Sequence, residues 1–191
     1  MIRAYTLMET IIALVVSALI SLGVASILQT AAYGTSSQRD IRRVVVQGEV
    51  VHERLDAAIR NSRAVLASGN GYVVLWTGDS NPDSHVNLSE MQLIEVPTGS
   101  TTLSAYSGVY TVGDPVYATS SNFYTVAQAA KAGSSFPRTT WATNISNLTF
   151  KLDNATPILS KLVTWSLTLT DQQLKQTIVS GALIGVPGQP R

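Results

Sequence analysis

An uncharged apolar run near the amino terminus constrains this chain more than any other feature. Residues 11–28 read IIALVVSALISLGVASIL, eighteen residues without a charged side chain. With the small residues that follow, the run reaches the ~20 residues that a helix needs to cross a bilayer core of about 30 Å. We therefore expect a transmembrane helix over residues 5–32. Two alternatives are a buried core helix and a cleaved secretory signal, for which residues 30–32 (Thr-Ala-Ala) offer a small-residue cleavage site.

The chain as a whole is sparsely charged and rich in hydroxyl groups. Charged residues make up 13% of the 191 residues, about half of the ~25% typical of globular proteins, and Ser and Thr together number 41. The net charge of +1 lacks the basic excess of a nucleic-acid-binding protein, so no nucleic-acid partner is expected. Because the chain has no cysteine, disulfides, thiolate zinc sites and cysteine nucleophiles are excluded.

One acidic residue stands beside the apolar run. Glu9 precedes it by two residues, within the otherwise hydrophobic flank YTLMETIIAL. A carboxylate at the centre of a membrane helix costs up to ~2.5–3.5 kcal/mol on insertion scales. At the start of the helix this cost falls, because the positive end of the helix dipole favours an anion. Glu9 is therefore either a simple first-turn acid or a charge that awaits a partner in an assembly.

These residues carry a family resemblance. The segment MIRA-YTLMETIIALVVSALISLGVASIL resembles the amino terminus of type IV prepilins and pseudopilins, in which a short basic leader precedes an aromatic residue, Thr, Leu, a hydrophobic residue, Glu and a long apolar helix. Ala4 stands where the family usually has Gly, and Tyr5 where it usually has Phe. The resemblance covers about thirty residues, and it requires the leader length, the acid and the apolar run to coincide.

The resemblance implies how the chain is processed and assembled. Residues 1–4 would be a leader, cut by a prepilin peptidase between Ala4 and Tyr5, and the same enzyme would methylate the new Tyr5 amine. Glu9 would neutralise the amine of a neighbouring pilin or pseudopilin subunit. The precursor would be a single-pass protein of the bacterial inner membrane with a periplasmic domain, assembled on an inner-membrane platform. Arg42 and Arg43 follow the span, and the positive-inside rule alone favours the opposite orientation.

A second helical pattern follows the apolar run. After a polar break, apolar or small residues recur at spacings of three and four, which predicts an amphipathic helix over residues 33–68 that buries one face. The residues of this face are Ile41, Val44, Gly48, Val51, Leu55, Ala58, Ser62 and Val65. Residues 68–71 (Ser-Gly-Asn-Gly) are expected to end the helix. His52 is expected on the solvated side.

The remaining chain has the pattern of a β-rich globular domain over residues 69–185, followed by a disordered tail over 186–191. Strands are predicted at 72–76, 91–96, 101–106, 109–112, 148–152, 161–170 and 174–184, with a short helix near 126–132. Residues 164–170 alternate hydroxyl and apolar side chains, as in a half-buried strand. The predicted fold class is α+β, a long N-terminal helix packed on an antiparallel sheet, as in pilins. This arrangement is most similar to minor pseudopilins of the J or W kind.

Residues 79–90 match the ligand positions of a twelve-residue EF-type calcium loop, with Ser84 in place of its Gly. The flanks read as strands, so the loop resembles the chemistry of an EF-hand but not its fold. Bound Ca²⁺ would have a structural role, and the alternative is a metal-free polar hairpin loop. The candidate ligands are the side chains of Asp79, Asn81, Asp83, Asn87 and Glu90 and the backbone carbonyl of His85.

No pattern indicates an enzyme. The chain has two histidines, and it lacks the G-x-S-x-G elbow, the P-loop and the dinucleotide-binding glycine pattern. The resemblance of the N-terminal segment implies a minor pilin or pseudopilin subunit of a type II secretion or type IV pilus-like filament. The alternative is a signal-anchored extracytoplasmic binding or adhesion domain without a role in a filament.

Overall fold

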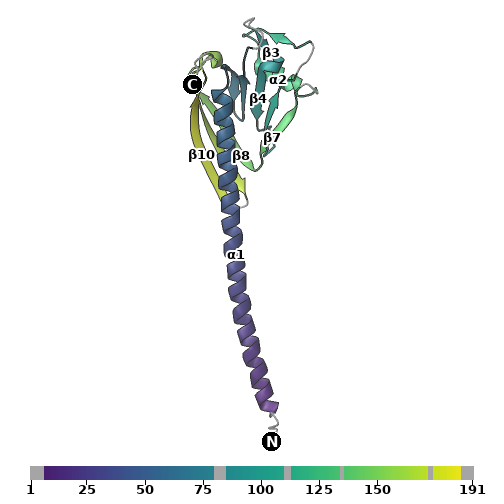
Figure 1. Ribbon diagram of the computed structural model, residues 1–191, viewed down its shortest axis with the longest axis vertical. Helices are drawn as coiled ribbons and strands as arrows, with labels where there is room; N and C mark the ends of the chain where they lie inside the picture. The colour runs from purple at the N-terminus through teal and green to yellow at the C-terminus, as the bar shows by residue number, and fades with distance from the viewer. Residues whose placement is uncertain (1–6, 80–84, 110–112, 134–135, 172–173, 186–191) are drawn as a thin grey trace. The chain divides into compact units, whose positions relative to one another are not determined.

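The computed structural model describes residues 7–79, 85–109, 113–133, 136–171 and 174–185, and within residues 31–40 it describes the backbone alone (Figure 1). The chain divides into two compact units, Met1–Arg43 and Val44–Arg191. Helix α1 (Leu7–Arg60) contributes residues to both units. The globular unit adds antiparallel sheets and a short helix, which confirms the predicted α+β class.

Helix α1 ends earlier than the apolar spacing predicts. It stops at Arg60, and residues expected to continue the helix form strand β1 (Ala64–Gly69). The prediction of a helix to residue 68 is therefore wrong. Strand β1 pairs with β2 (Tyr72–Trp76) through the two-residue connection Asn70-Gly71, in which Gly71 has a positive φ of 80°. An Asn-Gly pair between apolar segments is a strong hairpin signal, and here it closes a hairpin rather than ending a helix.

The strands form a five-stranded, a three-stranded and a two-stranded sheet within the described residues, and the pairings are antiparallel. The first sheet has the order β1-β2-β4-β5-β7, with β4 at Met91–Glu95, β5 at Leu103–Ser107 and β7 at Arg138–Ala142. The second has the order β10-β9-β8, with bounds Leu174–Leu183, Leu162–Asp171 and Ile145–Leu152. The third joins β3 (Val86–Asn87) to β6 (Val116–Tyr117).

Most predicted strands correspond to observed ones. The segments expected at 72–76, 91–96, 101–106, 148–152, 161–170 and 174–184 match β2, β4, β5, β8, β9 and β10. A further strand is expected at 109–112. Val109 does not belong to a strand, and residues 110–112 lie outside the described part of the chain. Helix α2 (Phe123–Ala130) begins before the predicted residue 126, because the Asn122 side chain accepts a hydrogen bond from the Thr125 backbone N–H at 3.2 Å and caps it.

The larger hydrophobic core of the globular unit is built from α1 and the two main sheets. Four side chains of α1, Val44, Val51, Leu55 and Ile59, are buried in it. Trp165, Leu167 and Leu169 of β9 are buried in the same core, as the alternation of that strand predicts. The predicted helical face is thus largely confirmed from Val44 onward, with Ile59 added to it.

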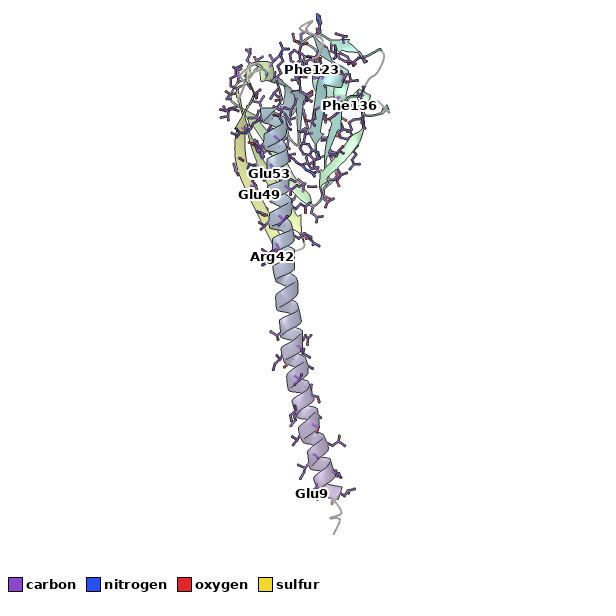
Figure 2. All side chains as sticks on the ribbon, in the orientation of Figure 1. Glu9, Arg42, Glu49, Glu53, Phe123 and Phe136 are labelled. Atoms are coloured by element: carbon purple, nitrogen blue, oxygen red, sulfur yellow. The ribbon has the colours of Figure 1, made fainter. Side chains whose placement is uncertain are left out.

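A second core covers the other face of the five-stranded sheet. Val74 and Trp76 of β2 point into it, whereas their neighbours Val73 and Leu75 belong to the larger core. Both faces of β2 are therefore covered, which explains its continuous apolar sequence YVVLW. The second core also includes Phe123 of α2, and Phe136 (both labelled in Figure 2).

A buried carboxylate links α2 to the five-stranded sheet. The Glu95 side chain on β4 is 3% exposed and forms a salt bridge with Lys131, the residue that caps the C-terminus of α2. Gln128 Nε2 donates a second hydrogen bond to Glu95 Oε2 at 2.7 Å, and Lys131 Nζ donates to Gln128 Oε1 at 3.0 Å. This hydrogen-bonded network ties α2 to the five-stranded sheet.

Candidate functional site

The N-terminal unit contains a helical segment long and apolar enough to span a membrane. Within residues Leu7–Thr30 of α1, an 18-residue stretch has a mean hydropathy of 2.7, and none of this stretch is buried inside the structure. A signal sequence shares these properties of length and composition. Large apolar side chains are exposed along the segment, including Leu7 at 80% and Ile27 at 69%. An exposed apolar surface of this extent is stable only when lipid or another protein covers it.

Four of the five hydroxyl groups of this segment form hydrogen bonds within the helix. Thr10, Ser21, Ser26 and Thr30 each donate a hydrogen bond to the backbone carbonyl three or four residues earlier, at 2.7–2.9 Å. In hydrocarbon an unsatisfied polar group costs several kcal/mol, so internal hydrogen bonds suit a membrane environment. These four hydroxyls therefore present no unsatisfied donor to the hydrocarbon of a membrane.

Glu9 is the single charged residue of the span Leu7–Thr30 and lies in the first turn of α1 (Figure 2). Its side chain is exposed, and the positive end of the helix dipole stabilises an anion at this position. The two residues of the predicted processing site, Ala4 and Tyr5, lie outside the described residues. The structure therefore places the acid at the start of the apolar helix and does not test its pairing with a Tyr5 amine.

The predicted calcium loop begins at the end of strand β2. Asp79 Oδ2 accepts a hydrogen bond from Arg63 in a salt bridge, and the Asp79 side chain is 9% exposed. Asp79 Oδ1 is buried without a hydrogen-bond partner among the described residues. The Arg63 guanidinium lies over the Trp76 ring, with its carbon 4.3 Å from the ring centre. One oxygen of Asp79 is thus held by a cation, and the other has no donor among the described residues.

The other end of the loop is turned inward. Glu90 is 4% exposed, and its Oε2 accepts hydrogen bonds from the Asn87 backbone N–H and from Trp76 Nε1, each at 3.2 Å. Residues Leu88–Glu90 form a 3₁₀ turn, η1, which positions this carboxylate. Asn87 lies in strand β3 opposite Val116, and its side-chain Oδ1 is buried without a hydrogen-bond partner among the residues that the structure describes. His85 is exposed.

This geometry bears on the calcium prediction. In an EF-type loop the last glutamate gives both oxygens to the ion, whereas Glu90 Oε2 here binds two N–H groups. The described residues contain no group of three or more His, Asp or Glu side chains placed to hold a metal. Asn81 and Asp83 lie outside the described residues, so the calcium site stays a prediction.

A pocket that the sequence did not indicate lies at the C-terminal end of α1. Its volume is about 240 Å³, and its lining includes Arg60, Arg63, Asp79 and Gly185. The antiparallel hairpin, which sets Ala64 opposite Trp76, brings Arg63 and Asp79 together across a separation of sixteen residues. No local motif encodes such a pair, because its proximity depends on the register of β1 and β2.

His52 differs from its expected position. The sequence pattern predicts His52 on the solvated side of the helix, but its Nδ1 is buried without a partner among the described residues. Its ring packs against Trp165 with a centroid distance of 5.8 Å. The correction follows from the width of the buried face of α1, since His52 lies four residues after Gly48 and three before Leu55, which are both buried.

Comparisons with models of protein families, with curated proteins and with solved structures found no match for this chain. The geometry therefore defines the protein at the level of an α+β globular unit and an apolar N-terminal helix of membrane-spanning length.

Proposed function

We propose that the chain is a minor pilin or pseudopilin subunit of a type II secretion or type IV pilus-like filament, with a pilin-like fold. One observation carries this proposal: a single acid lies in the first turn of an exposed apolar segment, and the same helix provides the core-packing face of an α+β unit. A simple membrane anchor needs the apolar segment but not the acid. A soluble domain needs neither.

In this proposal the span Leu7–Thr30 holds the precursor in the bacterial inner membrane, with the globular unit in the periplasm. A prepilin peptidase removes residues 1–4 and methylates the amine of Tyr5. The span then moves from lipid into contact with other pilin or pseudopilin subunits on the inner-membrane assembly platform. The apolar side chains exchange one apolar environment for another.

Glu9 gives this assembly its axial register. Once protein surrounds the helix, a dehydrated carboxylate needs a cation, and leaving one member of a buried ion pair alone typically costs 3–5 kcal/mol. The nearest cation that the proposal supplies is the Tyr5 amine of the adjacent subunit. The stagger that joins the two charges is favoured over others.

The mature amino terminus tests the proposal. The full-length chain is expressed in a bacterial host with and without a prepilin peptidase, purified from membranes in detergent, and analysed by mass spectrometry of its N-terminal peptide. We expect a methylated Tyr5 start that requires the peptidase. An intact Met1, or a start near Tyr33, would instead support the signal-anchored binding or adhesion domain.

A second experiment separates anchoring from assembly. Glu9→Gln keeps the size of the side chain but removes its charge, and Thr10→Val at the next position serves as the matched control. Both variants should insert into the membrane. We expect Glu9→Gln to lose cross-linking to neighbouring subunits, whereas Thr10→Val keeps it. Equal cross-linking of the two variants would refute the role of the charge.

A further inference from the structure

The pocket at the C-terminal end of α1 lies within the globular unit, and the proposed function leaves it unused. Its volume is about 240 Å³. Because a water molecule occupies about 30 Å³ in the liquid, this volume corresponds to a ligand of about eight non-hydrogen atoms. The lining residues, which run from Arg60 to Gly185 in the chain, all belong to the unit Val44–Arg191. A ligand in this pocket therefore requires no part of the N-terminal apolar segment.

Two arginines in the pocket wall are each held by a carboxylate. Arg60 Nε donates a hydrogen bond to Asp56 Oδ2 at 2.5 Å, one helical turn earlier. Arg63 forms the salt bridge with Asp79 and lies over the Trp76 ring. The side chains of Arg60 and Arg63 are 46% and 35% exposed. Since a guanidinium group carries five N–H donors, each arginine keeps donors for an oxyanion in the pocket.

The pocket also has a negative side. Asp79 lines it, and the Oδ1 atom of this nearly buried carboxylate lacks a hydrogen-bond donor among the described residues. A buried acceptor without a donor costs free energy, so a ligand that donates to Asp79 removes this cost. Helix α1 ends at Arg60, and the carbonyl groups at the end of a helix carry a partial negative charge that favours a cation. Gly185 packs so closely against the Arg60 carbonyl that a Cβ atom would clash with it.

The arrangement of charge determines the class of ligand. A simple anion would approach Asp79 and the negative end of α1, whereas a simple cation would approach two guanidinium groups. Each is repelled by one side of the pocket. We propose that the pocket binds a small zwitterion, an α-amino acid, with its carboxylate on Arg60 and Arg63 and its ammonium group on Asp79. Such a ligand is complementary to both signs of charge.

The contact between Arg63 and Asp79 sets the separation of the two charges in the ligand. These side chains form a direct salt bridge, so the groups that bind them must also be neighbours. In an α-amino acid a single carbon atom joins the ammonium and carboxylate groups, whereas several carbons separate them in an ω-amino acid. The χ2 torsion of aspartate is broad, so a small rotation of the Asp79 carboxylate turns Oδ1 toward the ammonium group.

A titration with four small molecules tests this assignment. The ¹⁵N-labelled full-length chain in detergent is titrated with L-alanine, with propionate, which lacks the ammonium group, with ethylamine, which lacks the carboxylate, and with γ-aminobutyrate, which separates the two charges. The NMR signals of Arg63 Nε–H and Trp76 Nε1–H report on the pocket, because the Arg63 guanidinium lies over the Trp76 ring.

We expect alanine to shift both signals saturably, with a dissociation constant at least about tenfold lower than that of each other molecule. This factor corresponds to the loss of about one hydrogen bond between charged groups. Equal dissociation constants for alanine and propionate, or for alanine and ethylamine, would reduce the pocket to a site for one sign of charge and overturn the proposal. The absence of a saturable shift with alanine would overturn it as well.

Substitutions assign each charge of the ligand to its partner. Asp79→Asn removes the negative charge at nearly constant size and should abolish the preference for alanine over propionate. Arg60→Gln, at a side chain that is 46% exposed, should lower the preference for alanine over ethylamine. Lys175→Gln, on the exposed side of β10, is the matched control and should keep both preferences.

The NMR spectrum of each variant also reports whether it is folded. If Asp79→Asn unfolds, Arg60→Gln decides the test, because its partly exposed side chain can be replaced without opening the core. Folded variants that bind alanine as tightly as the natural chain would refute the assignment of the charges.

The same titration separates the amino acid from the predicted calcium site, because Asp79 is also a candidate calcium ligand. Movement of both signals with Ca²⁺ but not with alanine would assign Asp79 Oδ1 to the metal and overturn the proposal. Saturable movement with alanine in a calcium-free buffer would support it. Neither result depends on processing at Ala4 and Tyr5, so a failure here leaves the proposed function unaffected, and the reverse also holds.

Discussion

Replacing Lys131 by Met should destabilise the globular unit by about 3 kcal/mol. The Glu95 side chain is 3% exposed, and its carboxylate accepts hydrogen bonds from Lys131 Nζ and Gln128 Nε2. In Lys131→Met, the Gln128 amide is the remaining donor to this buried carboxylate among the described residues. Removing one partner of a buried ion pair typically costs 3–5 kcal/mol. The lower end applies because the Lys131 side chain is 21% exposed, so water compensates part of the lost charge.

The design isolates the charge from the packing. Met keeps most of the length of the Lys131 side chain, whose Nζ lies 5.0 Å from the centre of the Tyr106 ring. The double variant Glu95→Gln/Lys131→Met removes both charges, and replacing a buried ion pair by neutral groups of similar size is often close to neutral. We therefore expect the double variant to be more stable than Lys131→Met alone, with a coupling energy of about 2 kcal/mol.

Urea unfolding of the full chain in detergent, followed by tryptophan fluorescence, measures these differences. The three tryptophans, at positions 76, 141 and 165, all belong to the globular unit, so the signal reports its unfolding. A loss below about 1 kcal/mol for Lys131→Met would contradict the reasoning, since a buried, unpaired carboxylate costs more than that. Additive effects of the two substitutions would contradict it equally.

Three further predictions concern the globular unit. Gly108→Ala should cost about 2 kcal/mol in urea unfolding, because its Cβ would clash with the Leu88 carbonyl oxygen, whereas Gly78→Ala, whose Cβ would meet no described atom within 4 Å, should change stability by less than about 1 kcal/mol. The backbone N–H groups of Leu162 and Lys161 hold the pKa of Asp153 below its ordinary value of 3.8. The Asp153 carboxylate therefore contributes fully to the stability of the fold above its unfolded-state pKa, and this stabilisation is lost as the pH falls through the lower folded-state pKa. Asp153→Asn should thus be less stable than the natural chain near neutral pH, and pH-dependent melting curves of the two should converge in acid. If the predicted calcium loop binds its ion, calcium at 100 times its dissociation constant should add ~2.7 kcal/mol and raise the melting temperature, and an unchanged melting temperature would remove that site.

The parts of the fold that depend on local periodicity could be predicted from sequence. The apolar span and the alternation in β9 each reflect a repeating pattern that one environment imposes on a continuous segment. Strand β1 was missed because Ser62 and Val65, beyond the end of α1, continue its three- and four-residue spacing by coincidence. Strand β7 was missed because Arg138–Ala142 has little apolar character and Ala142 is its buried residue.

The candidate site depends more on tertiary structure. The loop pattern over residues 79–90 depends on residue types and their spacing alone. It does not indicate that the 3₁₀ turn at Leu88–Glu90 directs the Glu90 side chain toward Trp76. The salt bridge between Arg63 and Asp79 likewise depends on strand register. Glu9 is different, because its position relative to the apolar run is a property of the sequence itself.

The internally bonded hydroxyls of the apolar span have a consequence for reversibility. Since Thr10, Ser21, Ser26 and Thr30 bind carbonyls of their own helix, the helix keeps these bonds in lipid, in detergent and against protein. Transfer between these surroundings then breaks none of the four, so they add no barrier in either direction. In the proposed filament, the rate at which a subunit enters or leaves its neighbours would depend chiefly on the desolvation of the Glu9 carboxylate, and it should therefore respond to one substitution at Glu9 more than to any change among these four hydroxyls.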